Sequence, residues 1–149
     1  MRISLGDVSL WFDVSGPSVI PQGDTTAERP VVVAVHGGPG LDHMTVKSAL
    51  GPLAGDFQVV YFDLRGHGRS DHSSAEFWNV RSWADDLRRL CDALGQRQPV
   101  VLGSSFGGNV VSSRRRRTRA WSPGMSRSRN SSSWSGGSVR PPRRCPRRR

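Results

Sequence analysis

The most informative segment of the 149-residue chain reads Val100-Val101-Leu102-Gly103-Ser104-Ser105-Phe106-Gly107-Gly108. Its first three residues form an apolar run typical of a strand buried on both faces of a parallel sheet. The next five fit the pattern Gly-x-Ser-x-Gly, with Ser105 at its centre. A serine on a sharp strand-to-helix turn takes a strained backbone, and the flanking glycines let neighbouring chain pass close by. The pattern predicts an exposed hydroxyl above a helix N-terminus, whose amides favour developing negative charge.

Two earlier apolar runs also end in glycine-rich loops. Residues 31–35 are followed by His36-Gly37-Gly38-Pro39-Gly40, and residues 59–62 by Asp63-Leu64-Arg65-Gly66-His67-Gly68. Helical segments are expected between the runs, one over about residues 45–53 and a clearer one over 80–94. This alternation predicts a parallel α/β sheet with right-handed crossovers. Ligands bind at the carboxyl ends of such strands, where the three loops would converge.

The clearer helix rests on a single apolar stripe made of Val80, Trp83, Ala84, Leu87, Leu90, Cys91 and Leu94. Asn79 is suited to cap its start and Gly95 to end it. We expect Asp85, Asp86 and Asp92 to belong to its solvated face.

Before the first buried run, residues 3–14 predict a β-hairpin about Gly6-Asp7. Residues 16–30 show no periodicity and predict a loop.

The three glycine-rich segments, in this order, resemble the α/β-hydrolase superfamily over about residues 1–110. His36-Gly37-Gly38-Pro39-Gly40 is similar to its proline iminopeptidase-like branch. The resemblance implies that Ser105 is a nucleophile that attacks an acyl carbon, and that the backbone amides of Gly38 and Phe106 form the oxyanion hole. It further implies a small ester, amide or short peptide as substrate, with no cofactor and no metal.

The acid and the histidine of the superfamily's triad follow the serine along the chain. After Ser105 this sequence contains no Asp, Glu or His; its last acid is Asp92 and its last histidine is His72. We therefore hypothesise that the 149 residues form a truncated, inactive portion of an α/β-hydrolase domain. The strand at residues 100–102 would then be an apolar open edge, which favours aggregation.

A metal site is the alternative role for His36, His43, His67 and His72, but their spacings match no ligand pair on one helix face. We expect structural or loop roles for them. Cys91 and Cys145 lie in compositionally unrelated regions and predict neither a disulfide nor a metal framework.

Charge divides the chain at residue 110. Residues 1–110 carry nine basic and twelve acidic side chains, a net charge of −3, whereas residues 111–149 carry thirteen Arg and no acid. Ten Ser, four Pro and three Gly accompany these arginines, so this tail is expected to be disordered alone.

No apolar run in the sequence approaches the ~20 residues of a membrane span. With no apolar secretory core near residue 1, we expect a cytoplasmic protein with no membrane partner.

Three interpretations of the tail remain open. It could be a nucleic-acid-binding arm, with arginines for phosphates and Trp121 and Trp134 to stack on bases, on a non-catalytic scaffold. It could be a solvated tail without function. It could also follow a reading-frame slip near residues 110–112, because in a G/C-rich gene alanine codons read out of register become Arg or Pro. Of the three, the slip explains most of the composition, and nucleic acid is the least favoured partner.

Overall fold

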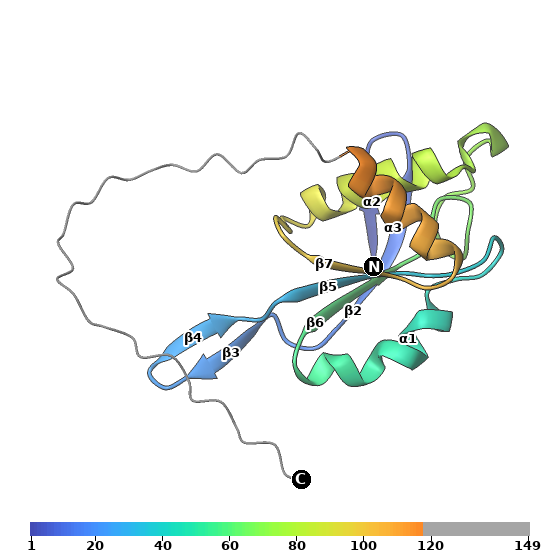
Figure 1. Ribbon diagram of the computed structural model, residues 1–149. Coiled ribbons are helices and arrows are strands. Elements are labelled where there is room, and N and C mark those ends of the chain that lie inside the picture. The colour runs from blue at the N-terminus through green and yellow to red at the C-terminus, as the bar shows by residue number, and fades with distance from the viewer. Residues whose placement is uncertain (118–149) are drawn as a thin grey trace, which may run out of the picture.

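The computed structural model describes residues 1–117, with the side chains of residues 1–113 (Figure 1). The strands are β1 Arg2–Ser4, β2 Ser9–Ser15, β3 Val19–Gln22, β4 Thr25–Glu28, β5 Val31–Val35, β6 Gln58–Phe62 and β7 Val100–Gly103. The α-helices are α1 Met44–Leu50, α2 Val80–Ala93 and α3 Phe106–Arg117, and short 3-10 turns cover Gly51–Gly55 and Ala75–Phe77.

Five strands form one mixed sheet in the order β1-β2-β6-β5-β7. The N-terminal hairpin is antiparallel and joins the sheet through β2 and β6, whereas β6, β5 and β7 run parallel. Helix α1 covers one face of this sheet, and α2 and α3 cover the other (Figure 1). The structure thus confirms the predicted hairpin, the parallel strands and their crossover helices.

Both faces of β5 are buried because its side chains alternate between two apolar clusters. Val33 and Val35 pack in the cluster that includes Leu87 of α2 and Val110 of α3. On the other face, Val32 and Ala34 pack in the cluster that includes Val46 of α1. A continuous β-branched run is what such a doubly covered strand requires.

Helix α2 follows its sequence signals closely. The Asn79 side chain accepts a hydrogen bond of 3.0 Å from the amide of Ser82, as expected of an N-cap. Gly95, directly after the last turn, has a φ of +70°. Within the predicted solvated face, however, Asp86 is only 1% exposed, because its carboxylate is enclosed by the side chain of Arg65. The expectation that Asp86 is solvated is therefore wrong.

The predicted loop over residues 16–30 is also wrong, since β3 and β4 form a hairpin there. Gln22 pairs with Thr25, which leaves Gly23-Asp24 as a two-residue turn, and Gly23 has a φ of +61°. Such a turn needs a residue that tolerates positive φ, and glycine does. Little apolar periodicity marks the two strands, because this hairpin projects away from the main sheet (Figure 1).

The end of the described chain bears on two further expectations. Helix α3 crosses the predicted boundary between residues 110 and 111 and continues to Arg117. The remainder of the predicted tail lies outside the described residues. Among the described strands β7 is an outermost one, with Val100 50% and Leu102 38% exposed.

Candidate active site

Ser105 lies on the bend between β7 and α3, and its side chain is exposed. Its φ of +48° is the only positive value at a non-glycine residue in the described part of the chain. Two turn hydrogen bonds shape the bend: the Gly107 amide donates to the Ser104 carbonyl at 2.8 Å, and the Gly108 amide donates to the Ser105 carbonyl at 2.9 Å. The Phe106 amide makes no such bond to a described residue and lies at the start of α3, where helix amides lack partners.

The glycines around Ser105 are required by close backbone packing. A Cβ atom on Gly107 would lie 2.5 Å from the carbonyl oxygen of Val35 and 2.6 Å from that of His36. A Cβ atom on Gly103 would lie 2.5 Å from the carbonyl carbon of Gly107. Each of these positions therefore excludes any larger residue, which gives the Gly-x-Ser-x-Gly spacing its physical cause.

The first glycine-rich loop lies directly against this bend. A Cβ atom on Gly37 would be 3.1 Å from the Cβ of Ser105 and 3.0 Å from the carbonyl oxygen of Ser104. The Ser104 amide also donates a 3.0 Å hydrogen bond to the carbonyl of Val35, at the end of β5. The backbone that follows β5 and the serine bend are thus neighbours, as the sheet topology requires.

His36 fixes the orientation of this loop. The Leu64 amide donates to its Nε2 at 3.1 Å, so Nδ1 carries the proton and donates to the Gly37 carbonyl at 3.0 Å. Burial lowers the pKa of His36 below its ordinary value, which keeps this neutral form. Because a trans peptide points its carbonyl and the next amide in opposite directions, the Gly38 N–H points away from His36.

The loop after β6 is held by buried polar groups. The fully buried carboxylate of Asp63 accepts bonds from the His43 amide at 2.8 Å, the His43 Nδ1 at 2.8 Å and the Arg69 amide at 2.9 Å. Arg65 binds both carboxylate oxygens of Asp86, at 2.7 and 2.8 Å. His36, His43 and His67 are buried and hydrogen-bonded within the fold, as expected of structural roles. His72 is exposed in the loop before α2, beside the Trp78 ring.

Sequence patterns did not reveal these pairs, because each joins residues about twenty positions apart. A weak signal existed for Asp63: an acid placed directly after a buried strand needs partners. Within residues 1–113, no group of three or more His, Cys, Asp and Glu side chains could hold a metal ion.

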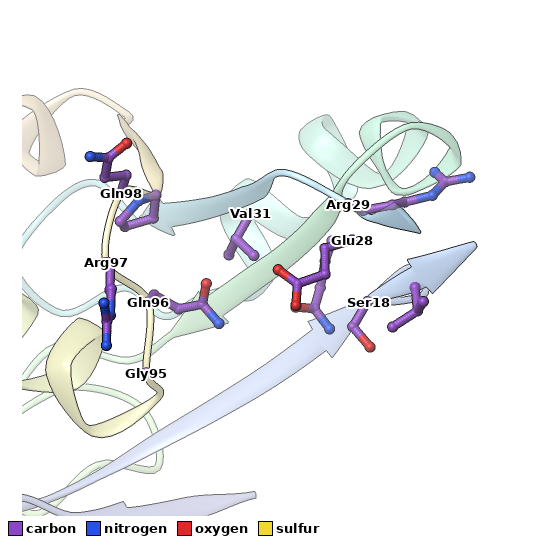
Figure 2. A pocket seen from close by; sticks show the side chains of 11 residues that line it. Ser18, Glu28, Arg29, Val31, Gly95, Gln96, Arg97 and Gln98 are labelled. Atoms are coloured by element: carbon purple, nitrogen blue, oxygen red, sulfur yellow. The ribbon is translucent and has the colours of Figure 1, made fainter. Parts of the chain in front are cut away.

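Two pockets open at opposite ends of the parallel strands. One, of about 540 Å³, lies at the carboxyl end and is lined by the three glycine-rich segments and the start of α2. The other, of about 550 Å³, lies at the amino end, among Glu28, Val31 and Gln96 (Figure 2). Only the first includes a neighbour of Ser105, namely Phe106.

The family described as the alpha/beta hydrolase fold matches residues 30–113, more than half of the chain. The chain belongs to the α/β-hydrolase family. The match covers all three glycine-rich segments and ends inside α3.

Relatives named as proline iminopeptidases are among the matches. A proline iminopeptidase of Pestalotiopsis fici is 28% identical over 71% of this chain and 35% of its own length. A putative carbamate hydrolase of a Caulobacter species is 36% identical over 51% of this chain and 33% of its own. This α/β-hydrolase chain thus spans about a third of the length of these relatives.

Solved structures of a proline iminopeptidase and of a related protein also resemble this chain. The proline iminopeptidase-related protein from Thermus thermophilus has a TM-score of 0.68 at 29% identity, over 79% of this chain and 40% of that one. The proline iminopeptidase of Mycobacterium smegmatis has a TM-score of 0.65 at 28% identity, over 76% of this chain and 38% of that one. None of the helices in the described part of this α/β-hydrolase is long and apolar enough to cross a membrane.

Proposed function

We propose that this α/β-hydrolase chain carries the nucleophile and oxyanion hole of a serine hydrolase acting on small esters, amides or short peptides. Ser105 is the nucleophile, and the amides of Gly38 and Phe106 are the oxyanion donors. The observation that carries the proposal is the strained Ser105 bend against Gly37. Strained backbone at an exposed serine, beside a loop from another strand, is typical of a functional position.

The chemistry requires a sequence of proton transfers. The Ser105 Oγ bonds to the acyl carbon, its proton passes to a base, and the carbonyl electron pair moves to oxygen as a tetrahedral oxyanion. When that pair returns, the bond to the leaving group breaks, and the conjugate acid protonates the leaving group. Water, deprotonated by the same base, then bonds to the acyl carbon. The bond from that carbon to Ser105 Oγ breaks, and the conjugate acid returns the proton to Oγ. Two amide donors stabilise the oxyanion in both steps.

No base is supplied at Ser105 by the described residues. No Asp, Glu or His side chain in residues 1–113 hydrogen-bonds to Ser105. Both ring nitrogens of His36 are occupied, by Gly37 and Leu64, and His43 is buried against Asp63. Nor does an Asp, Glu or His follow Ser105 in the sequence. We therefore propose that the 149 residues alone do not turn over substrate, since a triad without its base retains only a small part of its rate.

Chemical rescue tests both parts. In buffer without imidazole, p-nitrophenyl acetate is expected to give no turnover above that of Ser105→Ala. Added imidazole supplies the base, so we expect slow acetylation with one acetyl group per chain, located on Ser105 by peptide mass spectrometry. Ser104→Ala, which removes the neighbouring exposed hydroxyl, should retain this acetylation.

Two results would contradict the proposal. Imidazole-independent turnover that Ser105→Ala abolishes would show that the chain is a competent enzyme. Acetylation spread equally over Ser104 and Ser105 would remove the special role of the bend.

The origin of the missing base belongs to the same proposal. A frame slip near residues 110–112 predicts that the gene, read in another frame beyond codon 112, encodes an Asp and a His. Nucleotide sequence from codon 105 to beyond codon 149 tests this, and an alternative frame without either residue refutes it. The cytoplasmic location and the independence of cofactors expected from the sequence are also part of the proposal.

A further inference from the structure

The pocket at the carboxyl end of the sheet lies between three segments that are distant in sequence. Pro39 and Gly40 come from the loop after β5, and Gly66 and His67 from the loop after β6. The start of α2 and Phe106 complete it. Its volume of about 540 Å³ falls within the range of small-molecule sites.

Four of its nine lining residues carry aromatic or imidazole rings, namely His67, Trp78, Trp83 and Phe106. The Trp83 and Phe106 rings meet edge to face, with centroids 5.3 Å apart, and the Trp83 indole N–H donates to the Arg65 carbonyl at 2.9 Å. Trp78 is seated over Gly66, where a Cβ atom would lie 2.5 Å from its Nε1. The Trp83 ring is therefore held in place before any ligand arrives, and the Trp78 ring lies close to the backbone of Gly66.

The lining includes no Asp, Glu, Lys or Arg side chain. An ion would lose its hydration there without gaining a partner, so the pocket disfavours charged groups. An uncharged ring, in contrast, would contact apolar and aromatic surface on several sides, and aromatic pairs add to the gain from burial.

One ring nitrogen remains for a ligand. His67 is 4% exposed, and its Nδ1 lies 2.9 Å from the Arg65 carbonyl, to which it donates. Its Nε2 forms no hydrogen bond within the described residues and is left to accept one. The Asn79 side chain, also in the lining, is already committed to Ser82 and to the Glu76 carbonyl.

We propose that this pocket binds an uncharged ring, aromatic or alicyclic, on the acyl group that is delivered to Ser105. The inference rests on the proposed function for its link to Ser105, whose neighbour Phe106 forms one wall. It assigns the proposed hydrolase to esters or amides of ring-bearing, uncharged acids.

Binding is measured first, without chemistry. Phenylacetamide is titrated into ¹⁵N-tryptophan-labelled protein while the indole N–H signals of Trp78 and Trp83 are followed by NMR. We expect saturable shifts with phenylacetamide and at least tenfold weaker binding of phenylacetate, which differs by a charged carboxylate. Ser105→Ala should bind phenylacetamide as the parent does.

Two exposed aromatic neighbours provide a matched pair of variants. Trp78 lines the pocket and is 43% exposed, whereas Phe77, 42% exposed, does not line it. Trp78→Ala should weaken phenylacetamide binding roughly three- to tenfold, and Phe77→Ala should weaken it by less than about twofold. The Trp83 indole N–H signal reports binding in both variants. Equal effects of the two variants, or equal binding of amide and acid, would overturn the inference.

Val80→Asp places a charge in the wall at the first position of α2. Val80 is partly buried against the core, so the charge costs stability, but an acidic residue is favourable at a helix N-terminus and offsets part of that cost. Circular dichroism establishes that the variant is folded. The variant should lose phenylacetamide binding at least fivefold. Unchanged affinity in the folded variant would show that the ring binds elsewhere.

The link to Ser105 is tested by imidazole-assisted acylation. We expect p-nitrophenyl phenylacetate to acylate Ser105 at least threefold faster than p-nitrophenyl acetate, and Trp78→Ala to abolish that preference. Equal rates for the two esters would overturn the inference and leave the nucleophile assignment intact. Phenylacetamide binding without acylation of Ser105 by either ester would instead overturn the proposed function and support the ring site.

Discussion

The loop that follows β6 and the bend that follows β7 lie at the same edge of the sheet, yet the described chain encloses only the first. Asp63 and Arg65 in the β6 loop are 0% and 3% exposed, and each is bonded to groups from other segments. The bend after β7 presents an exposed Ser105, and its strand has an apolar edge open to solvent. The β6 loop is thus enclosed by partners from other segments, whereas the bend that carries Ser105 is open in the described part of the chain.

The largest effect should come from the enclosed loop. Arg65→Ala removes the bidentate partner of the buried Asp86 and leaves that carboxylate only the 3.4 Å contact with Arg89, so the free energy of unfolding should fall by about 3 kcal/mol. Urea denaturation measures this. Arg88→Ala is the control: Arg88 forms only exposed ion pairs with Asp85 and Asp92, so less than about 1 kcal/mol should be lost.

A double variant separates charge from packing. Replacing Arg65 by Met and Asp86 by Val together should recover much of the lost stability, since an apolar pair of similar total volume needs no compensation. A double variant as unstable as Arg65→Ala would show that shape, and not the buried charge, is what the loop requires.

The second effect concerns the bend itself. Gly107→Ala would bring a Cβ atom within 2.6 Å of two carbonyl oxygens, and it should cost about 3 kcal/mol because backbone cannot move aside as a side chain can. In Gly108→Ala the added atom meets only the Gly103 carbonyl oxygen, at 3.7 Å, and alanine should stabilise the helix by about 0.5–1 kcal/mol. Thermal unfolding of both variants compares them; two similar losses would show that the bend tolerates a Cβ.

Sequence reasoning succeeded wherever a local requirement determines the structure. The strand at residues 31–35 is apolar at every position because helices cover both its faces, and the glycines at 103 and 107 are demanded by neighbouring backbone. Since parallel strands end at one sheet edge, the approach of Gly37 to Ser105 also followed from topology.

Prediction from the sequence failed where a partner from another segment determines whether a residue is buried. Asp86 belongs to the polar side of α2 by periodicity, but it is buried, with its carboxylate bound by Arg65, which approaches from the β6 loop. The β3–β4 hairpin has little buried surface, so no periodic signal marks it, although Gly23-Asp24 is a recognised two-residue turn.

A smaller, pH-dependent effect follows from His36. Its pKa in the folded protein is lowered by burial, so the unfolded chain binds its proton more readily. Stability is therefore full above the ordinary histidine pKa and falls as pH decreases below it, by at most about 1.4 kcal/mol per pH unit for this group. Urea denaturation at pH 7.5, 6.5 and 5.5 should show a smaller loss in His36→Gln, whose amide oxygen can still accept from Leu64. A loss as steep as that of the parent would assign the pH dependence to other groups.

The smallest effect on stability, and the most direct probe of the open side, is expected at the edge of β7. Val100→Lys places a charge where the side chain is 50% exposed, so the free energy of unfolding should change by less than about 0.5 kcal/mol. A charged edge resists pairing with another strand, so self-association measured by sedimentation velocity should decrease. Met44→Lys adds the same charge at a 54% exposed position on α1, away from the edge, and should leave association unchanged. If both lysines reduce association equally, net charge and not the open strand governs it, and the contrast between the enclosed loop and the open bend has no consequence for how the chains meet.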